Sequence, residues 1–437
     1  MKSSVLLTSV TTVLLVAAST ALALDWPQWR GPDRTNVSKE TGLLKTWPKD
    51  GPKLAWANKT MGLGFSSPSI VGDRLYMLGS RKDATYLIVL DARSGKEEWS
   101  ARVGDMFTFD GNTWGDGPRS TPTIDGDRVY VLGGYGDLVC FDIPKRAEVW
   151  RKNLTKDFGG EMMTEWGFSE SPLVDGELLI CTPGGEKGTL AALDKKSGKL
   201  VWQSKELTNK APYSSVVVSE AGGVRQYIQT SYTSVPEAGF ISGFAAKSGK
   251  LLWTEPIFKR SSYAIAPTPV VRDNLVYATS GYGAGCHLFE LSAKGSGVKA
   301  KEVYPKQLQR TVKNTHGGVV LVGDHIYGHS EVLGWVCQNF KTGEIAWKNR
   351  NKLDCTSGAI TAADGKLYLY SDEGTAVLLE ASTKQWQESG RFNIPEKSKT
   401  PETRRTSSAA KIWAIPVIVN GRLYLRDQEL LFCYEVR

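Results

Sequence analysis

The chain has 437 residues, of which 41% are hydrophobic and 23% are charged, and its formal net charge is +8. The lysine and arginine residues are scattered and form no basic tract, which argues against a nucleic-acid-binding protein. Its six cysteines include no adjacent pair and no Cys-x-x-Cys motif, so the sequence leaves their disulfide pairing open and predicts no metal site.

The N-terminus, residues 1–23, has the pattern of a cleaved secretory signal peptide. Lys2 gives a basic start, Val5 to Ala18 is mostly apolar, and Ala21-Leu22-Ala23 is a small-x-small cleavage site. The apolar run is shorter than the roughly 20 residues that span a bilayer, and no later segment is long and apolar enough to do so. The first cysteine is Cys140, so no cysteine stands at the cleavage site to carry a lipid. We expect an exported protein, periplasmic or secreted, without a lipid anchor.

A hairpin pattern recurs along the rest of the chain. Each copy has an apolar strand, a turn rich in Gly, Asp and Asn, and a second apolar strand. Such turns predict tight β-hairpins because these residues tolerate a positive φ. Copies about 50 residues apart are typical of propellers and solenoids. The eight copies are Pro68–Tyr76, Pro122–Tyr130, Pro172–Ile180, Ser215–Tyr227, Pro269–Tyr277, Val319–Tyr327, Ile360–Tyr368 and Pro416–Tyr424.

A second pattern follows the hairpins and supplies two further strands. Its clearest copy is LDKKSGKLVW, Leu193–Trp202, in which a third strand ends at a Ser-Gly-Lys turn and a fourth strand carries Trp. Related copies end at Trp99, Trp253 and Trp347. Four short strands per repeat, without helical periodicity, predict an all-β fold: an eight-bladed β-propeller of four-stranded antiparallel blades. We expect Trp202 to be buried between neighbouring blades.

The two ends of the chain predict how the ring closes. The last repeat stops after its third strand, Glu429 to Val436, whereas Lys53 to Asn58 looks like an unpaired fourth strand. Pairing them leaves no free terminal blade edge. We therefore predict that the N-terminal strand joins the last blade and that residues 24–437 form a single propeller domain.

The pattern Leu193-Asp194-x-x-Ser197-Gly198-Lys199-x-x-Trp202 resembles the tryptophan-docking repeat of the pyrroloquinoline-quinone (PQQ) type propellers. This superfamily contains the quinoprotein alcohol dehydrogenases and the BamB-type outer-membrane assembly lipoproteins. The segment Asp25 to Pro48 resembles the start of uncharacterised exported PQQ-like repeat proteins of planctomycetes and their relatives. The resemblance covers essentially the whole mature chain and implies the fold more strongly than a function.

The sequence lacks residues that the two known functions of this superfamily require. Quinoprotein dehydrogenases carry two adjacent cysteines on the cofactor and a calcium ion held by a Glu, an Asn and an acidic partner. This sequence has no Cys-Cys pair, and its candidate calcium ligands, such as Glu170, Asn314 and Asp354, are scattered. BamB-type proteins are anchored through a lipid-bearing cysteine, which is also absent.

We therefore favour a monomeric, non-catalytic binding or scaffold protein, for which no cofactor or metal is expected. One alternative is a PQQ-dependent alcohol or sugar dehydrogenase with a non-standard site, which would use PQQ and calcium. The other is a BamB-like outer-membrane protein assembly factor.

The binding site is predicted on the face of the ring where the chain leads into each blade. The first strand of a propeller blade lines the central channel, so eight lead-in segments, the residues just before each hairpin, converge on the axis. They carry large aromatic residues beside single charges, which suits a protein, peptide or glycan partner. The candidate ligand-binding residues are Trp114, Arg119, Trp166, Glu170, Tyr213, Asn314 and His316.

Each candidate also has a structural interpretation. Arg119 either clamps an anion or forms an ion pair with Asp116. Glu170 either serves as a base or metal ligand or accepts hydrogen bonds from backbone N–H groups. His316 either shuttles protons or is a hydrogen-bonded histidine of the channel. Trp114 and Trp166 either stack on a ligand or plug the channel.

Overall fold

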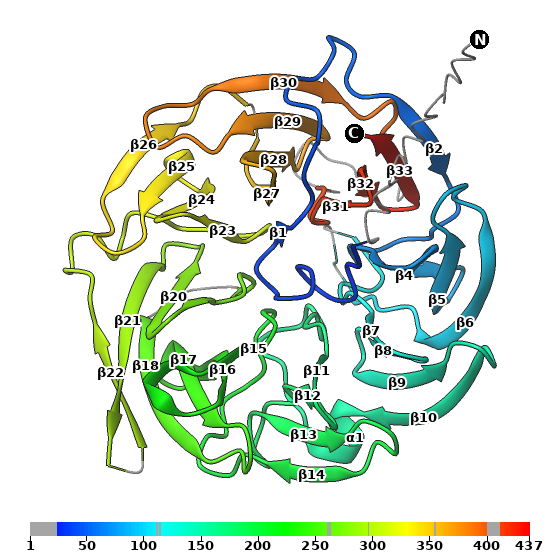
Figure 1. Cartoon of the computed structure of the whole chain (residues 1–437). Coiled ribbons are helices and arrows are strands. Elements are labelled where there is room, and N and C mark those ends of the chain that lie inside the picture. Colours follow the sequence, from blue (N-terminus) through cyan, green and yellow to red (C-terminus); the bar gives the residue numbers. More distant parts are fainter. Residues whose placement is uncertain are drawn as a thin grey trace, which may run out of the picture.

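Eight β-sheets, each a blade of four strands, surround one central axis in the structure, a computed structural model (Figure 1). The sheet of one blade also takes up a fifth strand, β1 (Val37–Ser38). The structure describes residues 24–110, 112, 115–259, 264–295, 297–353, 355–399 and 411–437. Within each blade the strands are antiparallel, and the first strand lies nearest the axis (Figure 1). The predicted eight-bladed propeller is confirmed.

Blades 1 to 4 consist of β3 (Ser69–Val71), β4 (Arg74–Arg81), β5 (Ala84–Asp91), β6 (Glu97–Asp105); β7 (Thr123–Asp125), β8 (Arg128–Leu132), β9 (Asp137–Asp142), β10 (Ala147–Asn153); β11 (Leu173–Asp175), β12 (Leu178–Cys181), β13 (Ala191–Asp194), β14 (Leu200–Gln203); and β15 (Val217–Ser219), β16 (Gln226–Ser234), β17 (Glu237–Ala245), β18 (Leu251–Lys259). Blades 5 to 8 consist of β19 (Val270–Arg272), β20 (Leu275–Ser280), β21 (Gly285–Lys294), β22 (Gly297–Glu302); β23 (Val319–Val322), β24 (His325–Ser330), β25 (Gly334–Asn339), β26 (Ile345–Asn349); β27 (Gly358–Ala363), β28 (Lys366–Ser371), β29 (Thr375–Glu380), β30 (Glu388–Asn393); and β31 (Val417–Val419), β32 (Arg422–Asp427), β33 (Leu430–Glu435) with β2 (Leu54–Asn58).

The helical content of the described residues is small, as the absence of helical periodicity predicts. It comprises α1 (Leu154–Phe158) and the single 3₁₀ turn η1 (Ala221–Gly223). The sequence analysis missed α1 because five residues are too few to show a helical period. Within the described ranges, no helix is both long and apolar enough to span a membrane.

The ring closes through the N-terminal strand, as predicted. Strand β2 pairs antiparallel with β33, with Trp56 opposite Cys433. The Trp56 indole N–H donates to the Ala92 carbonyl of blade 1 over 3.1 Å, and its ring packs against Gly95. One tryptophan therefore fastens the last blade to the first.

The same tryptophan–glycine contact joins neighbouring blades elsewhere. Trp150 of blade 2 packs on Gly198 of blade 3, and its indole donates to the Lys195 carbonyl over 3.0 Å. Trp202 of blade 3 packs on Gly249 of blade 4, but it is only partly buried and its indole N–H has no acceptor among the described residues. Trp150 is therefore buried between blades 2 and 3, whereas the burial expected for Trp202 is only partial.

This contact predicts a large effect of a methyl group at Gly249. A Cβ at this position would overlap the Trp202 ring, and the φ of +71° is unfavourable for other residues. We expect Gly249→Ala to lower the free energy of unfolding in urea by about 2–4 kcal/mol, against about 1 kcal/mol for Gly72→Ala. Gly72 is the matched control, because its φ is +57° and no atom lies within 4 Å of its Cβ position. Equal losses in the two variants would rule out docking on Gly249.

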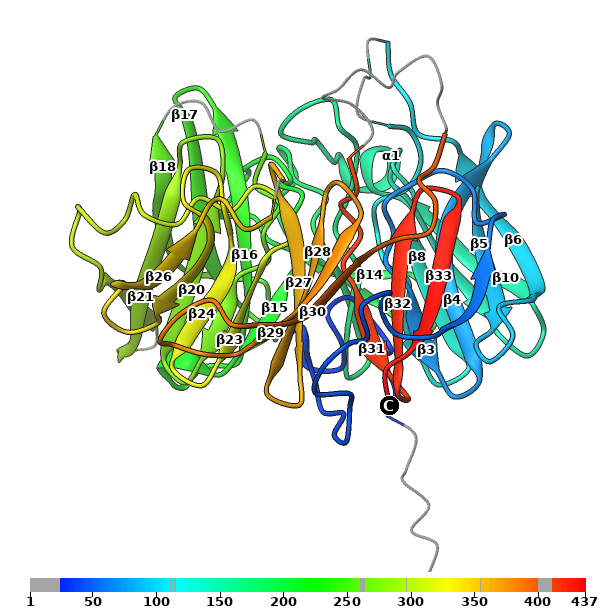
Figure 2. The ribbon, with the colours of Figure 1, turned by 90° about the horizontal axis from the view of Figure 1, so that it is seen from above.

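A feature that the sequence did not predict closes the centre of the ring. Residues 24–43, here called the N-terminal plug, cross the channel at the end of the ring opposite α1 (Figures 1 and 2). The plug includes β1 (Val37–Ser38), which pairs parallel with β27. Its hydrogen bonds reach every blade: Trp26 with Ile70, Pro27 with Ile124, Arg34 with Pro172 and Val216, Arg30 with Thr268 and Val319, Asn36 with Thr361, and Glu40 with Asn420.

Candidate functional site in the central funnel

A cavity of about 500 Å³ lies on the axis, on the lead-in side of the plug. All eight lead-in segments contribute to its wall, as the topology predicts. Trp29 and Arg30 of the plug also line it, so the plug forms its floor. In blade order, one lining residue from each lead-in segment is Phe65, Arg119, Trp166, Tyr213, Thr268, His316, Ser357 and Trp413.

The cavity brings together four of the predicted site residues. Arg119, Trp166, Tyr213 and His316 all line it. Glu170 and Asn314 lie outside its lining and are buried within the protein. The remaining candidate, Trp114, lies outside the described residues.

The wall contains a continuous stack of rings around one positive charge. The Arg119 guanidinium carbon lies 5.0 Å from the Phe107 ring centroid and 5.4 Å from that of Phe65. Phe65 stacks on Trp413 at 5.0 Å, and Trp413 stacks on His316 at 4.2 Å with an interplanar angle of 9°. Cation–π and stacking contacts of this kind fix the side chains before any ligand arrives.

Arg119 has no carboxylate partner in the described part of the chain. Its guanidinium donates to the backbone carbonyls of Gly117 at 3.0 Å and Gly115 at 3.3 Å. It forms no ion pair with Asp116, although both residues are described; the Asp116 carboxylate accepts from Asn112 at 2.8 Å. Burial lowers the pKa of Arg119 to about 10, so the side chain stays protonated at neutral pH. The cavity therefore contains a fixed cation.

His316 is neutral in this environment. Burial lowers its pKa to about 4, and the charge of Arg119 contributes to the shift. Above about pH 5 the imidazole therefore faces the cavity as an uncharged ring stacked on Trp413.

Glu170 and Asn314 make hydrogen bonds inside the protein, outside the lining of the cavity. The Glu170 carboxylate accepts hydrogen bonds from the Thr182 backbone N–H and, at 2.7 Å, from the Thr182 hydroxyl. The Asn314 amide donates to the carbonyls of Gly318 at 3.1 Å and His329 at 2.9 Å. Both arrangements agree with a structural role, since each side chain satisfies backbone or hydroxyl groups.

Glu170 makes stability depend on pH. Burial raises its pKa to about 7, although the Thr182 hydrogen bonds and Arg34 oppose the shift. Between about pH 4.5 and pH 7 the unfolded chain therefore releases a proton that the folded protein retains, and stability falls as pH rises. The shift corresponds to a loss of about 3 kcal/mol above pH 7.

We expect Glu170→Gln, which cannot ionise, to unfold at higher urea concentration than the wild type at pH 8. The expected gain is about 2–3 kcal/mol at pH 8 and disappears at pH 4.5. A difference between the variant and the wild type that is the same at both pH values would contradict the raised pKa. Because each comparison is made at one pH, the other titrating groups cancel.

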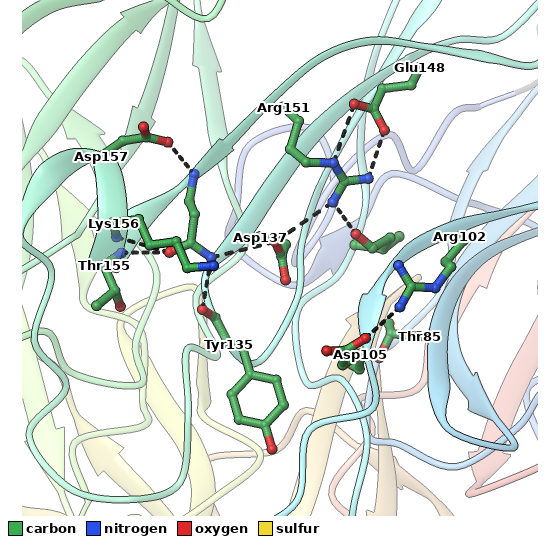
Figure 3. Close-up of polar contacts among 12 residues, drawn as sticks. Thr85, Arg102, Asp105, Tyr135, Asp137, Glu148, Arg151, Thr155, Lys156 and Asp157 are labelled. Carbon is green, nitrogen blue, oxygen red and sulfur yellow. Dashed lines mark hydrogen bonds and ion pairs between the residues drawn. The ribbon is translucent and has the colours of Figure 1, made fainter.

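Helix α1 positions the lead-in segment that carries Trp166. The Asn153 side chain accepts from the backbone N–H groups of Thr155 at 3.1 Å and Lys156 at 3.0 Å, and Asp157 accepts from the Asn153 backbone N–H. Figure 3 labels Thr155, Lys156 and Asp157 at this helix. Gly159, with φ of 67°, ends the helix in the left-handed conformation. The caps therefore fix where the chain turns towards the funnel.

The lining residues that the sequence analysis did not name include Trp29, Arg30 and Trp413. Trp413 precedes the last hairpin in the same way as the other lead-in residues, so extending that pattern to the eighth repeat would have found it. Trp29 and Arg30 reach the cavity only because the plug crosses the channel, and no repeat or alternation in the sequence signals this path.

The residues present do not fit a calcium–PQQ centre. Glu165 is the only carboxylate among the described lining residues. No group of three or more His, Cys, Asp or Glu residues that could hold a metal occurs in the described ranges. Asp354, the third candidate ligand, lies outside them. Phe65 and His316 already stack on Trp413, which leaves little of its ring for a planar cofactor.

Comparisons with known proteins agree with the fold. The family model described as outer membrane protein assembly factor BamB matches residues 83–349, more than half of the chain. The outer membrane protein assembly factor BamB of Shewanella oneidensis is 22% identical over 290 residues, which are 63% of this chain and 65% of the relative. That of Burkholderia pseudomallei is 23% identical over 234 residues, 47% of this chain and 59% of the relative. The chain thus matches less than two thirds of the length of either relative.

Solved structures with low sequence identity share the architecture. BamB from Moraxella catarrhalis has a TM-score of 0.57 and 16% identity, covering 88% of this chain and 99% of that one. The quinohemoprotein alcohol dehydrogenase ADHIIG from Pseudomonas putida HK5 has a TM-score of 0.64 and 12% identity, covering 94% and 80%. At these identities the likeness establishes the fold alone. From the family match over residues 83–349, the chain belongs to the family of the outer membrane protein assembly factor BamB.

Proposed function

We propose that the protein is a non-catalytic binding protein that holds a partner polypeptide in its central funnel. One observation carries this proposal: all eight lead-in segments contribute to one cavity of about 500 Å³. That volume falls within the range of ligand sites in proteins. The exposed surface of the lining is mostly apolar and aromatic, with the guanidinium of Arg119 in the wall and that of Arg30 in the floor, which suits an apolar peptide segment.

A role in outer-membrane protein assembly is the second candidate function. Its support is the match to the BamB family over residues 83–349. In this role the polypeptide in the funnel belongs to an outer-membrane protein before it folds. The protein would work as an exported monomer after removal of residues 1–23, which lie outside the described residues.

Filling the cavity tests the proposed function. Ala266 lines the cavity, so Ala266→Trp should occupy it, whereas Ala147→Trp adds the same side chain on exposed strand β10. The probes are fluorescein-labelled dodecapeptides tiled across one outer-membrane β-barrel protein, and fluorescence anisotropy gives their dissociation constants. We expect Ala266→Trp to weaken the binding peptides at least tenfold, because their site is sterically blocked, and Ala147→Trp to leave them unchanged. Unchanged affinity in Ala266→Trp would place peptide binding elsewhere.

A further inference from the structure

The side chains that line the cavity carry more positive than negative charge. Lys411 is neutralised by Asp372 and Glu373, and Glu165 is exposed at the rim. Arg119 and Arg30 have no carboxylate partner in the described part of the chain.

Arg30 is tied to the protein by its own hydrogen bonds. It is 3% exposed and donates to the backbone carbonyls of Thr268, Thr35 and Val319, while its Nε has no partner in the described structure. It therefore adds positive potential to the floor. Arg119 is more accessible, because it is only partly buried and lines the wall.

Arg119 is held ready for an anion. A guanidinium has five N–H donors, and among the described residues Arg119 donates two hydrogen bonds, to the carbonyls of Gly115 and Gly117. The rings of Phe65 and Phe107 restrict its movement. The remaining N–H donors can bind the two oxygens of a carboxylate. Such charge-assisted hydrogen bonds are stronger than hydrogen bonds between neutral groups.

The closed floor of the cavity favours binding of the end of a partner polypeptide over binding of its middle. The plug makes hydrogen bonds to all eight blades and supplies Trp29 and Arg30 to the floor, so an extended polypeptide cannot continue through the ring. A loop would need to place two strands in about 500 Å³. A chain terminus needs one strand, and a C-terminus brings its own carboxylate.

We propose that the funnel recognises the free C-terminal carboxylate of a polypeptide at Arg119, with the apolar side chain of its last residue against the aromatic wall. This inference rests on the proposed function, because it names the part of the partner that enters the cavity.

The test compares forms of one peptide that differ only at the C-terminus. The probe is the tightest-binding dodecapeptide from the tiled set that ends in an apolar residue, prepared as the free acid, as the amide and with two added glycines. N-acetyl-leucine serves as a competitor that represents a small carboxylic acid. The proteins are the full chain, Arg119→Met, Ala266→Trp and the control Arg93→Met, whose arginine is exposed and pairs with Asp73.

We expect the free acid to bind the wild type about ten- to a hundredfold more tightly than the amide, and Arg119→Met to remove this preference. The glycine extension should also bind more weakly, and N-acetyl-leucine should compete at least tenfold less well than the peptide. Arg93→Met should behave as the wild type. If Arg119→Met does not fold, the acid-to-amide ratio in the wild type and its loss in Ala266→Trp still decide the question.

The experiment distinguishes failure of C-terminus recognition from failure of the proposed peptide-binding function. Acid and amide that bind equally well, with both blocked by Ala266→Trp, would overturn recognition of the chain end and leave the funnel as a peptide site. Competition by N-acetyl-leucine at the affinity of the peptide would overturn it in favour of a small acid. Peptides that Ala266→Trp does not affect, or that bind nowhere, would overturn both the inference and the proposed function.

Discussion

Replacing Arg426 by methionine is expected to lower the free energy of unfolding by about 3–5 kcal/mol. The Arg426 side chain is 2% exposed and donates to four backbone carbonyls: Gln428 at 2.7 Å, Ser66 and Leu78 at 2.8 Å, and Gly62 at 2.9 Å. Three of these carbonyls belong to the segment that forms blade 1, whereas Arg426 lies on β32 of blade 8. The guanidinium thus bridges the seam where the ring closes.

The expected loss of stability arises because the four backbone carbonyls that accept from Arg426 lose their donor. Methionine fills much of the volume but donates no hydrogen bond, so buried acceptors are left without a donor. Urea unfolding measures the effect, with Arg93→Met as control. Arg93 pairs with Asp73 on the surface, and its loss is expected to change stability by less than about 1 kcal/mol. Similar stabilities of the two variants would mean that Arg426 does not hold the seam.

Replacing Arg34 by methionine is expected to lower the free energy of unfolding by about 3–5 kcal/mol at pH 8. The buried guanidinium of this plug residue donates to the carbonyls of Pro172 at 2.5 Å, Val216 at 2.8 Å and Ser171 at 3.1 Å. Its charge also lowers the pKa of Glu170. Without Arg34 the pKa of Glu170 rises further, and ionised Glu170 becomes more costly.

A double-mutant cycle separates these two contributions. At pH 8 we expect Arg34→Met to be less destabilising by about 1 kcal/mol in the Glu170→Gln background, because no carboxylate is left to ionise. At pH 4.5 this coupling should vanish. Additive losses at both pH values would show that Arg34 acts only through its backbone hydrogen bonds.

The repeats made most of the fold predictable. Each hairpin turn and each Ser-Gly-Lys turn is local, so eight copies specify eight blades without knowledge of long-range contacts. The closing strand was also predictable, because a repeat short of one strand at the C-terminus has its complement at Lys53 to Asn58.

The plug could not be predicted in the same way. Its residues meet partners hundreds of positions away, and only Val37 and Ser38 form a strand. Irregular backbone of this kind carries neither the two-residue period of a strand nor the period of a helix.

The site was predictable where it follows from topology. Lead-in position identified Arg119, Trp166, Tyr213 and His316 as residues that line the funnel. It did not separate them from Glu170 and Asn314, because a residue or two along an irregular segment decides whether a side chain points to the cavity or into the protein. The stack of Trp413 on His316 joins blades 8 and 6, and no pairing rule between such distant blades can be read from sequence.

Binding of a polypeptide in the funnel cavity is tested most directly by photocrosslinking. The photoreactive residue p-benzoylphenylalanine is placed at position 266 in the cavity or at position 147 on the outer strand β10, and each protein is irradiated with an unfolded outer-membrane β-barrel protein. We predict crosslinks from position 266, mapped by mass spectrometry to a limited part of the partner, and none from position 147. Crosslinks from position 147 alone would contradict a funnel site.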